Sequence, residues 1–212
     1  MGDGTISSGI NSTAMGTGTT ASGNYSTAIG SNTTAGGLIS TAMGNNTTAP
    51  SFGETTIGLY STSYTPLGDI SFNAADRLFT IGNGTAVGSR SDAMVVLKNG
   101  NTGIGTSTPV SSLHVAGSFG GNLTTTALAL TLTDAHYTVI ITGGTPIITL
   151  PTAASATGRV YNIVNHTAAA RTVQVSGTVG YTNLSGTANI LTVPLDGSII
   201  IQSNGTTWYQ IR

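Results

Sequence analysis

The acidic and basic side chains are the first residues to weigh for chemistry, because carboxylate catalysis and metal binding depend on them. The chain has seven Asp and Glu, six Lys and Arg, three His and no Cys. Thiolate zinc sites, thiol nucleophiles and disulfide scaffolds are therefore excluded. Glycan cleavage by carboxylates needs two acids about 5 to 9.5 Å apart. Asp69 with Asp76 is the only close pair beyond the N-terminal repeats, and we expect these acids to cap turns.

The remaining candidates for chemistry are equally isolated. His114, His136 and His166 are far apart in sequence, and we expect a structural role for His114 in an alternating strand. Asp134 and His136 could share a strand face and pair or bind a metal, although such a pair is more often structural. No Gly-x-Ser-x-Gly elbow follows a strand, and the glycines at 100, 103 and 105 precede no helix that could cradle a phosphate. We predict no catalytic residues, no metal and no cofactor, and hence not an enzyme, while an active site between chains stays open.

Charge and hydropathy exclude several classes of partner. Charged residues make up 6% of the chain and the net charge is −1, with Lys98 as the single lysine. No basic face is available to neutralise phosphates, so we expect no nucleic-acid binding. No apolar run reaches the roughly 18 residues of a membrane span, and the first residues lack a secretory signal, so we expect no membrane insertion.

The elements that must position any site are short strands arranged in an internal repeat. From residue 1 to 56 the sequence divides into blocks of fourteen residues without a gap, and the register fades after the next few residues. Each block holds two short extended pieces separated by Gly-rich or Asn-rich corners, which is typical of one coil of a solenoid. One position of the repeat is always Met or Ile, and it holds Met1, Met15, Ile29, Met43 and Ile57.

The size of the coil predicts which side chains face outward. A coil of fourteen residues has room inside only for Ser, Ala or Gly, so Ala14 should face inward and Thr13 and Met15 outward. Stacked about 4.8 Å apart, the Met and Ile side chains should form an apolar ladder on the outside of one chain. Because identical ladders of other chains can bury it, we infer an obligate homo-oligomer with this ladder at its interface.

The blocks resemble the head repeat of the YadA-like trimeric autotransporter adhesins. The segments NSTAMG (11–16), YSTAIG (25–30) and ISTAMG (39–44) match its Asn-Ser-x-Ala-Ile-Gly pattern, and ASG (21–23) and AGG (35–37) match the Ala-x-Gly that follows. The resemblance implies a left-handed parallel β-roll with three chains around one axis. No coiled-coil stalk follows the repeats, and the C-terminal TTWYQIR differs from the membrane barrel that anchors those adhesins.

For the rest of the chain the sequence predicts a connector over residues 67–121 and a C-terminal domain over residues 122–212. Alternating strands and the hairpin signals Asn83-Gly84 and Asn99-Gly100 mark the connector, and residues 97–118 look like connectors of phage tail fibres and large bacterial surface proteins. Eight short strands follow, which favours an antiparallel β-sandwich knob whose last hairpin closes at Asn204-Gly205. Residues 149–167 and the terminal GSIIIQSNGTTWYQIR resemble the tip domain of phage fibres.

Together these features predict an all-β homotrimer: a β-roll over residues 1–66, the connector and the knob. The resemblances imply a phage fibre or spike protein on the virion surface, held by a virion base or adaptor protein, whose knob binds a host surface glycan or protein receptor. The alternatives are a bacterial trimeric adhesin fragment on the cell surface and, less favoured, a polysaccharide-degrading tailspike. Candidate receptor contacts are Tyr181 and Asn183 in a projecting loop, and Trp208, for which a core position is the competing interpretation.

Overall fold

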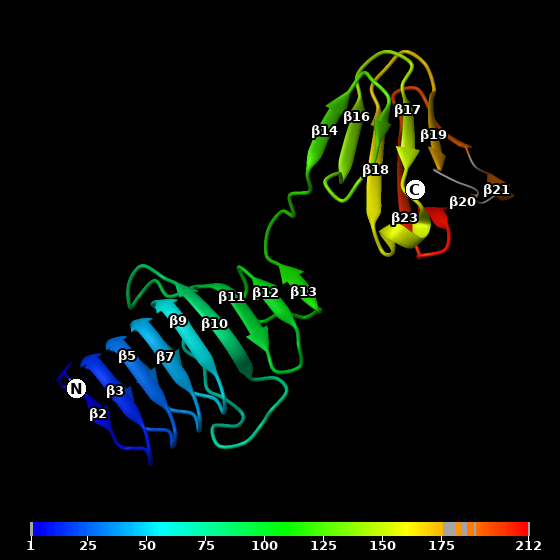
Figure 1. Ribbon diagram of the computed structural model, residues 1–212. Helices are drawn as coiled ribbons and strands as arrows, with labels where there is room; N and C mark the ends of the chain where they lie inside the picture. Colours follow the sequence, from blue (N-terminus) through cyan, green and yellow to red (C-terminus); the bar gives the residue numbers. More distant parts are fainter. Residues whose placement is uncertain (1, 176–180, 184–185, 189, 212) are drawn as a thin grey trace. The chain divides into compact units, whose positions relative to one another are not determined.

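The structure, a computed structural model, describes residues 2–175, 181–183, 186–188 and 190–211, with side chains described outside residues 174–190. Within these ranges one short 3-10 turn, η1 (Ala153–Ala156), accompanies the strands, which confirms the all-β prediction. The chain divides into two compact units, Met1–Phe119 and Gly120–Arg212, here called unit 1 and unit 2 (Figure 1). No helix in the described ranges is long and apolar enough to cross a membrane.

Unit 1 begins as a parallel β-roll in which every turn supplies one strand to each of two sheets (Figure 1). Neighbouring turns pair fourteen residues apart, with Thr13 beside Thr27 and Met15 beside Ile29, so the roll predicted from the repeat is confirmed. The first sheet takes β1 (Gly2–Asp3), β3 (Thr13–Thr17), β5 (Thr27–Ser31), β7 (Thr41–Asn45) and β9 (Thr55–Leu59), and the second takes β2 (Ile6–Ser7), β4 (Thr20–Ala21), β6 (Thr34–Ala35) and β8 (Thr48–Ala49).

Small side chains fill the roll, as the length of its coil requires. Along each strand alternate residues face opposite sides, so the residue between the outward Thr and Met of β3 points inward. Hydroxyl groups accompany the methyl groups in this interior, since buried Thr and Ser alternate with Ala along the chain within each turn. The buried alanines are Ala14, Ala21, Ala28, Ala35, Ala42 and Ala49, and the buried hydroxyl residues include Thr19, Ser26, Thr33, Ser40 and Thr47.

The first sheet continues beyond the repeats, which differs from the separate connector that the sequence predicted. Residues 80–82 reproduce the Thr-Ile-Gly of β9, and β10 (Arg77–Asn83) pairs with β9 in parallel, with Ile81 beside Ile57. Antiparallel pairing then adds β11 (Asp92–Leu97) and β12 (Thr102–Ile104), and β13 (Leu113–Val115) pairs in parallel at the edge. The predicted hairpin at Asn99-Gly100 is confirmed, because it joins β11 to β12.

Unit 2 is a two-layer β structure in which the chain first alternates between two sheets. A seven-stranded sheet has the order β14-β16-β18-β23-β24-β20-β21, and a four-stranded sheet has the order β15-β17-β19-β22. The strands are β14 (Leu123–Thr126), β15 (Leu130–Thr131), β16 (Thr138–Ile141), β17 (Ile147–Leu150), β18 (Val160–Asn165), β19 (Arg171–Val175), β20 (Tyr181–Asn183), β21 (Gly186–Ala188), β22 (Ile190–Val193), β23 (Ser198–Ser203) and β24 (Trp208–Gln210).

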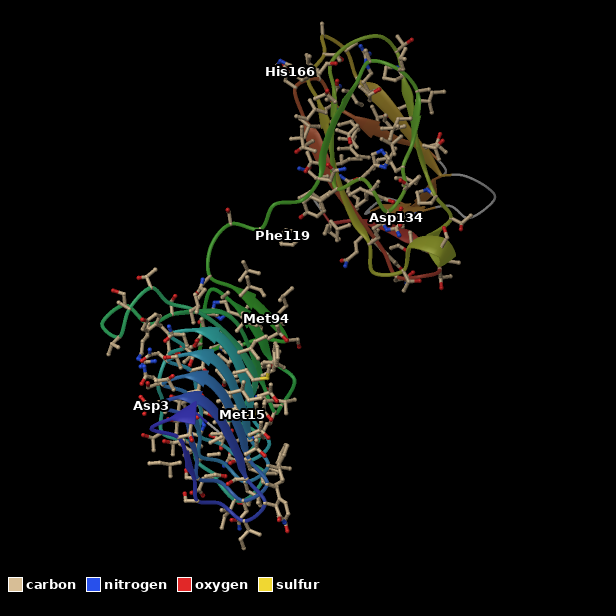
Figure 2. All side chains as sticks on the ribbon, turned by 60° about the vertical axis from the view of Figure 1, so that its left-hand side comes forward. Asp3, Met15, Met94, Phe119, Asp134 and His166 are labelled. Atoms are coloured by element: carbon tan, nitrogen blue, oxygen red, sulfur yellow. The ribbon has the colours of Figure 1, made fainter. Side chains whose placement is uncertain are left out.

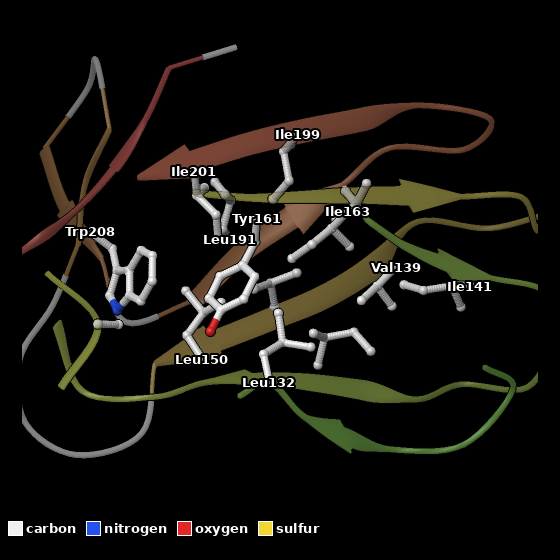
Figure 3. Packing of buried hydrophobic residues seen from close by; sticks show 14 of the residues in the cluster. Leu132, Val139, Ile141, Leu150, Tyr161, Ile163, Leu191, Ile199, Ile201 and Trp208 are labelled. Atoms are coloured by element: carbon white, nitrogen blue, oxygen red, sulfur yellow. The ribbon is translucent and has the colours of Figure 1, made fainter. Parts of the chain in front are cut away.

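Strand direction in unit 2 is only partly antiparallel. The strands β14, β16 and β18 pair in parallel, as do β15, β17 and β19, because each turn of chain crosses from one sheet to the other. Antiparallel pairing begins where β22 adds to β19 and β23 to β18, and β23 and β24 form the hairpin predicted at Asn204-Gly205. Branched aliphatic residues from both sheets fill the space between them, with Tyr161 and Trp208 as the aromatic members of the core (Figure 3).

Candidate interaction face and closing cluster

The predicted apolar ladder lies on the outer surface of the first sheet. Met15 is 40% exposed and Met43 42% exposed, and Ile29 and Ile57 are half-buried between their neighbours. The register places all four in one column, since each pairs with the next across adjacent strands. Met1 falls outside the described residues. The expected outward position is therefore confirmed for the four described members.

The column runs further than the fourteen-residue period predicts. Ile81 pairs with Ile57 and with Met94, Met94 pairs with Ile104, and Ile104 pairs with Val115. Met15 and Met94 lie on the same side of unit 1 in Figure 2. The fourteen-residue count ends at Ile57, so the later members cannot be found by period. The triplets at 80–82 (TIG) and 103–105 (GIG) repeat the residue types of the earlier turns and are the signal that could have found them.

A second column beside the ladder changes character along the sheet. Its first members are threonines, and its later members are mostly large and apolar, because strand pairing places Phe79 and Val96 in line with Thr55. No charged residue stands in either column, so nothing in them repels an identical surface. We call the two columns together the outer face: Met15, Ile29, Met43, Ile57, Ile81, Met94, Ile104 and Val115, with Thr13, Thr27, Thr41, Thr55, Phe79, Val96, Thr102 and Leu113.

A buried group of polar and charged side chains closes the end of the roll. It occupies repeat positions that hold small residues in earlier turns: Glu54 stands where Ser26 and Ser40 stand, and Ser51 where Gly37 stands. Glu54 is fully buried and accepts hydrogen bonds from three donors. Its donors are the Ser51 amide at 3.1 Å, the Thr56 hydroxyl at 3.2 Å and the Tyr64 hydroxyl at 2.9 Å. We call Ser51, Glu54, Thr62, Tyr64, Arg77, Asp92 and Lys98 the closing cluster.

An ion pair links this cluster to the added strands. Arg77 on β10 and Asp92 on β11 approach to 3.3 Å, with side chains 7% and 0% exposed. The Arg77 guanidinium also donates to the Thr62 carbonyl and hydroxyl and lies 4.3 Å from the centre of the Tyr64 ring. Asp92 accepts from the Thr62 amide and hydroxyl. Because the charges of Arg77 and Asp92 are paired and hydrogen-bonded, this pair satisfies the conditions under which buried ions are tolerated.

Burial shifts three pKa values in this region. Burial raises the pKa of the Glu54 carboxyl above its ordinary 4.5, although the donors from Ser51 and Tyr64 and the charge of Arg77 oppose the shift. The pKa of Tyr64 is also raised, first by burial and then by the neighbouring Glu54 charge. Burial lowers the pKa of Lys98, against the attraction of Asp76 and Glu54. In each case removal from water outweighs the favourable partners.

The cluster contains one contact that could suggest catalysis. The Lys98 side-chain nitrogen lies 2.9 Å from the Ser51 hydroxyl, and a lysine in its neutral form beside a serine can act as the base that activates it. However, Ser51 has no exposed surface, and its hydroxyl donates to the Arg77 carbonyl at 2.9 Å. A substrate cannot reach an oxygen without solvent exposure, so the arrangement serves to hold the end of the roll closed.

The acid pair predicted to cap turns separates into two different environments. Asp76 is buried, and its carboxylate accepts from the amides of Leu67 and Gly68, both at 2.8 Å. Asp69 lies on the exposed segment that Asp76 holds in place. Asp76 therefore has a structural role, but it holds a bend eight to nine residues earlier in the chain and does not cap its own turn.

Replacing Glu54 tests the electrostatics of the closing cluster. The pKa of Glu54 is raised in the folded state, so the folded protein keeps this proton at pH values at which the unfolded chain has lost it. The contribution of Glu54 to the free energy of unfolding therefore falls as the pH rises above 4.5. The free energy of unfolding of Glu54→Gln, relative to that of wild type, should therefore rise by about 1.4 kcal/mol per pH unit while folded Glu54 stays protonated. Urea unfolding of both proteins from pH 4 upward measures this difference.

A second variant changes the pKa of Glu54 while keeping its carboxyl. Tyr64→Phe removes a donor that lowers this pKa, so stability of the variant should keep falling to a higher pH than stability of wild type. A stability difference between Glu54→Gln and wild type that does not vary with pH would contradict the assignment.

The three candidate receptor residues have different positions. Trp208 is fully buried and donates from its indole nitrogen to the Pro151 carbonyl at 2.9 Å, so its proposed receptor contact is wrong and the core interpretation holds. Tyr181 and Asn183 are the ends of strand β20, and so do not lie in an irregular loop. Their side chains fall outside the described residues. Tyr209, the neighbour that the alternation of β24 turns outward, is 41% exposed.

The histidines do not form a metal site in the described part of the chain. No group of three or more His, Cys, Asp or Glu residues is placed to hold a metal there. His136 contacts the amide and hydroxyl of Thr133 at 3.0 Å through Nδ1. His166 instead lies 3.9 Å from Asp196, with both side chains largely exposed. His114 lies on the inward side of β13, in line with the buried Val95 of β11, because both residues pair with Gly103 of β12.

Comparison with known proteins supports the identity of the repeats. Residues 7–33 match the YadA head domain repeat in two copies. This match covers turns of the roll whose register and inward alanines are described above. Neither the curated proteins nor the solved structures include a detectable relative of the chain.

Proposed function

We propose that this chain is the attachment protein of a phage fibre or spike and acts as a homotrimer. The outer face carries this proposal, because one chain alone exposes a continuous uncharged surface with Met, Ile, Val, Phe and Leu on it. The YadA head repeats over residues 7–33 support an adhesin-like, surface-exposed protein. Three rolls around one axis can cover three such faces at once.

The energetics favour burial of this face. Covering a large apolar side chain contributes roughly 1.5 to 3 kcal/mol. Met15 and Met43 have about 40% of their surface exposed in one chain, so part of this free energy is gained only when a partner covers them. The interior of the roll cannot supply the missing stabilisation, because alanine methyl groups and hydroxyls fill it.

A trimer also suits attachment. Three knobs on one particle raise a weak single-site affinity for a repeated glycan or protein receptor on the host surface. In this proposal a virion base or adaptor protein holds the fibre. A bacterial trimeric adhesin fragment is the second candidate, and the YadA head repeats favour it as directly.

The oligomeric state gives the first test. Light scattering on wild type should report three times the 21.2 kDa of one chain. Met43→Asp places a charge in the outer face and should shift the mass toward that of one chain, because a buried unpaired charge costs several kcal/mol. Thr34→Asp, in a half-buried position on the second sheet, is the control and should leave the mass unchanged. A wild-type mass of one chain would contradict the trimer.

Cell binding separates the phage protein from the adhesin. The fluorescently labelled wild-type chain is incubated with a panel of bacterial strains and with animal cells and their matrix. A phage attachment protein should bind a subset of bacteria, whereas binding to animal cells or matrix alone would favour the adhesin. Met43→Asp should weaken either binding, because it removes multivalency.

A further inference from the structure

A groove on unit 2 is lined by amide, hydroxyl, aromatic and aliphatic residues. It has a volume of about 500 Å³, within the range of small-molecule sites, and lies over the hairpin of β23 and β24. Its lining residues are Gln202, Ser203, Asn204, Tyr209, Gln210 and Ile211. Ser203 is buried, and the other five are exposed.

The strand register brings the groove's aromatic and amide groups together. Gln202 pairs with Tyr209 across the hairpin, so both side chains leave the sheet on the side opposite the buried Trp208. The Asn204 amide nitrogen lies 3.5 Å from the Tyr209 hydroxyl. An aromatic ring thus stands among primary amides, which carry both donors and acceptors.

The support beneath the groove is fixed by buried contacts. The Trp208 indole donates to the Pro151 carbonyl and stacks near Tyr161, with ring centroids 5.4 Å apart. The Ser203 hydroxyl donates to the Ala153 carbonyl at 2.8 Å. The Asn204 side-chain oxygen accepts from the amides of Thr206 and Thr207, at 2.9 and 2.8 Å. A ligand therefore meets side chains whose backbone is already held, which reduces the entropy lost on binding.

The chemistry of these groups defines the ligand class. Amide groups can donate to and accept from adjacent hydroxyls, and the Tyr209 ring and Ile211 offer apolar surface to the C–H face of a pyranose. Among the described residues that line the groove none is charged, so they offer no counter-charge to a phosphate or carboxylate. We propose that this groove binds a neutral oligosaccharide, an inference that rests on the attachment function and names its ligand class.

The test uses the chain of residues 1–212 and named sugars. Lactose, maltotriose, chitotriose and mannotriose are titrated with saturation-transfer NMR, with a hyaluronan tetrasaccharide as the charged comparison. At least one neutral sugar should bind, and Tyr209→Ala should weaken its binding by about tenfold, as the loss of one aromatic contact predicts. Tyr209→Phe keeps the ring and should stay within about twofold of wild type.

Two controls separate local from general effects. Tyr25→Ala removes a phenol that is 57% exposed on unit 1 and should leave sugar binding unchanged. The fluorescence of Trp208, the only tryptophan, reports whether the fold of unit 2 survives each substitution. Should Tyr209→Ala alter that signal, Gln202→Ala replaces it as the test variant, with the same expected loss of affinity.

The outcomes also distinguish the groove from the attachment function. Absence of binding by any neutral sugar, preference for the charged sugar, or equal affinity in wild type and a folded groove variant overturns the groove. If wild type still binds cells in those cases, attachment stands and the receptor site lies elsewhere. If neutral sugars bind through Tyr209 while cell binding fails, the groove stands and the attachment function falls.

Discussion

Gly30→Ala should unfold much of the roll, with a loss of at least about 4 kcal/mol in stability. Gly30 lies within β5 at φ +128°, a conformation that L side chains rarely adopt. An added Cβ would stand 1.9 Å from the Gly44 carbonyl oxygen of the next turn. Backbone occupies that space, so no side-chain movement can relieve the clash. Circular dichroism during urea unfolding measures the loss.

The same turn of the repeat contains the matched control. At Gly36 the nearest atoms to an added Cβ are the Ser22 hydroxyl at 3.8 Å and the Pro50 Cα at 3.9 Å. Gly36→Ala should therefore change stability by less than about 1 kcal/mol. Similar stabilities for the two variants would show that the strands of the roll do not approach each other as closely as described.

Trp208→Ala should destabilise unit 2 by about 3 to 5 kcal/mol. The side chain is fully buried, packs near Tyr161 and donates a hydrogen bond to the Pro151 carbonyl (Figure 3). Truncation leaves a cavity at the end of the core and an unpaired carbonyl oxygen. For a domain of this size the unfolding temperature of unit 2 should fall by more than about 12 °C. Differential scanning calorimetry measures this shift.

The neighbouring residue controls for the position in β24. Tyr209→Ala changes an exposed side chain and should alter stability by no more than about 0.5 kcal/mol. The transition of unit 1 should be unaffected by either change, since the two units are separately compact. A small effect of Trp208→Ala would mean that the indole is exposed after all, and would restore it as a receptor contact.

The period of the repeat was sufficient to predict the roll. Fourteen residues per turn restrict the interior to small side chains, so the inward alanines and the outward Met15 and Met43 follow from spacing alone. The hairpins at Asn99-Gly100 and Asn204-Gly205 were also predictable, because the turns between antiparallel strands require residues that tolerate unusual backbone angles.

The closing cluster was not predictable from the sequence. Glu54 and Ser51 are three residues apart, but Arg77, Asp92 and Lys98 reach them only after β10 and β11 return to the sheet. The burial of a charged residue cannot be predicted from the sequence until the partner that pairs with it is known. The extension of the ladder to Ile81 and Met94 departs from the fourteen-residue period, so the triplet at 80–82 was its only sequence signal, and strand pairing brings both residues into line.

The groove over β23 and β24 depends both on the sequence pattern of β24 and on the tertiary structure around it. Alternation established that one of Trp208 and Tyr209 faces inward, but which one depended on the sheet against which β24 packs. The sequence by itself determined the repeat, its inward and outward residues and the tight turns, because these depend on the covalent spacing of neighbours. Only the tertiary structure decided the direction of the strands in unit 2, the ionic end of the roll and the groove around Tyr209, because these depend on contacts between residues that are distant along the chain.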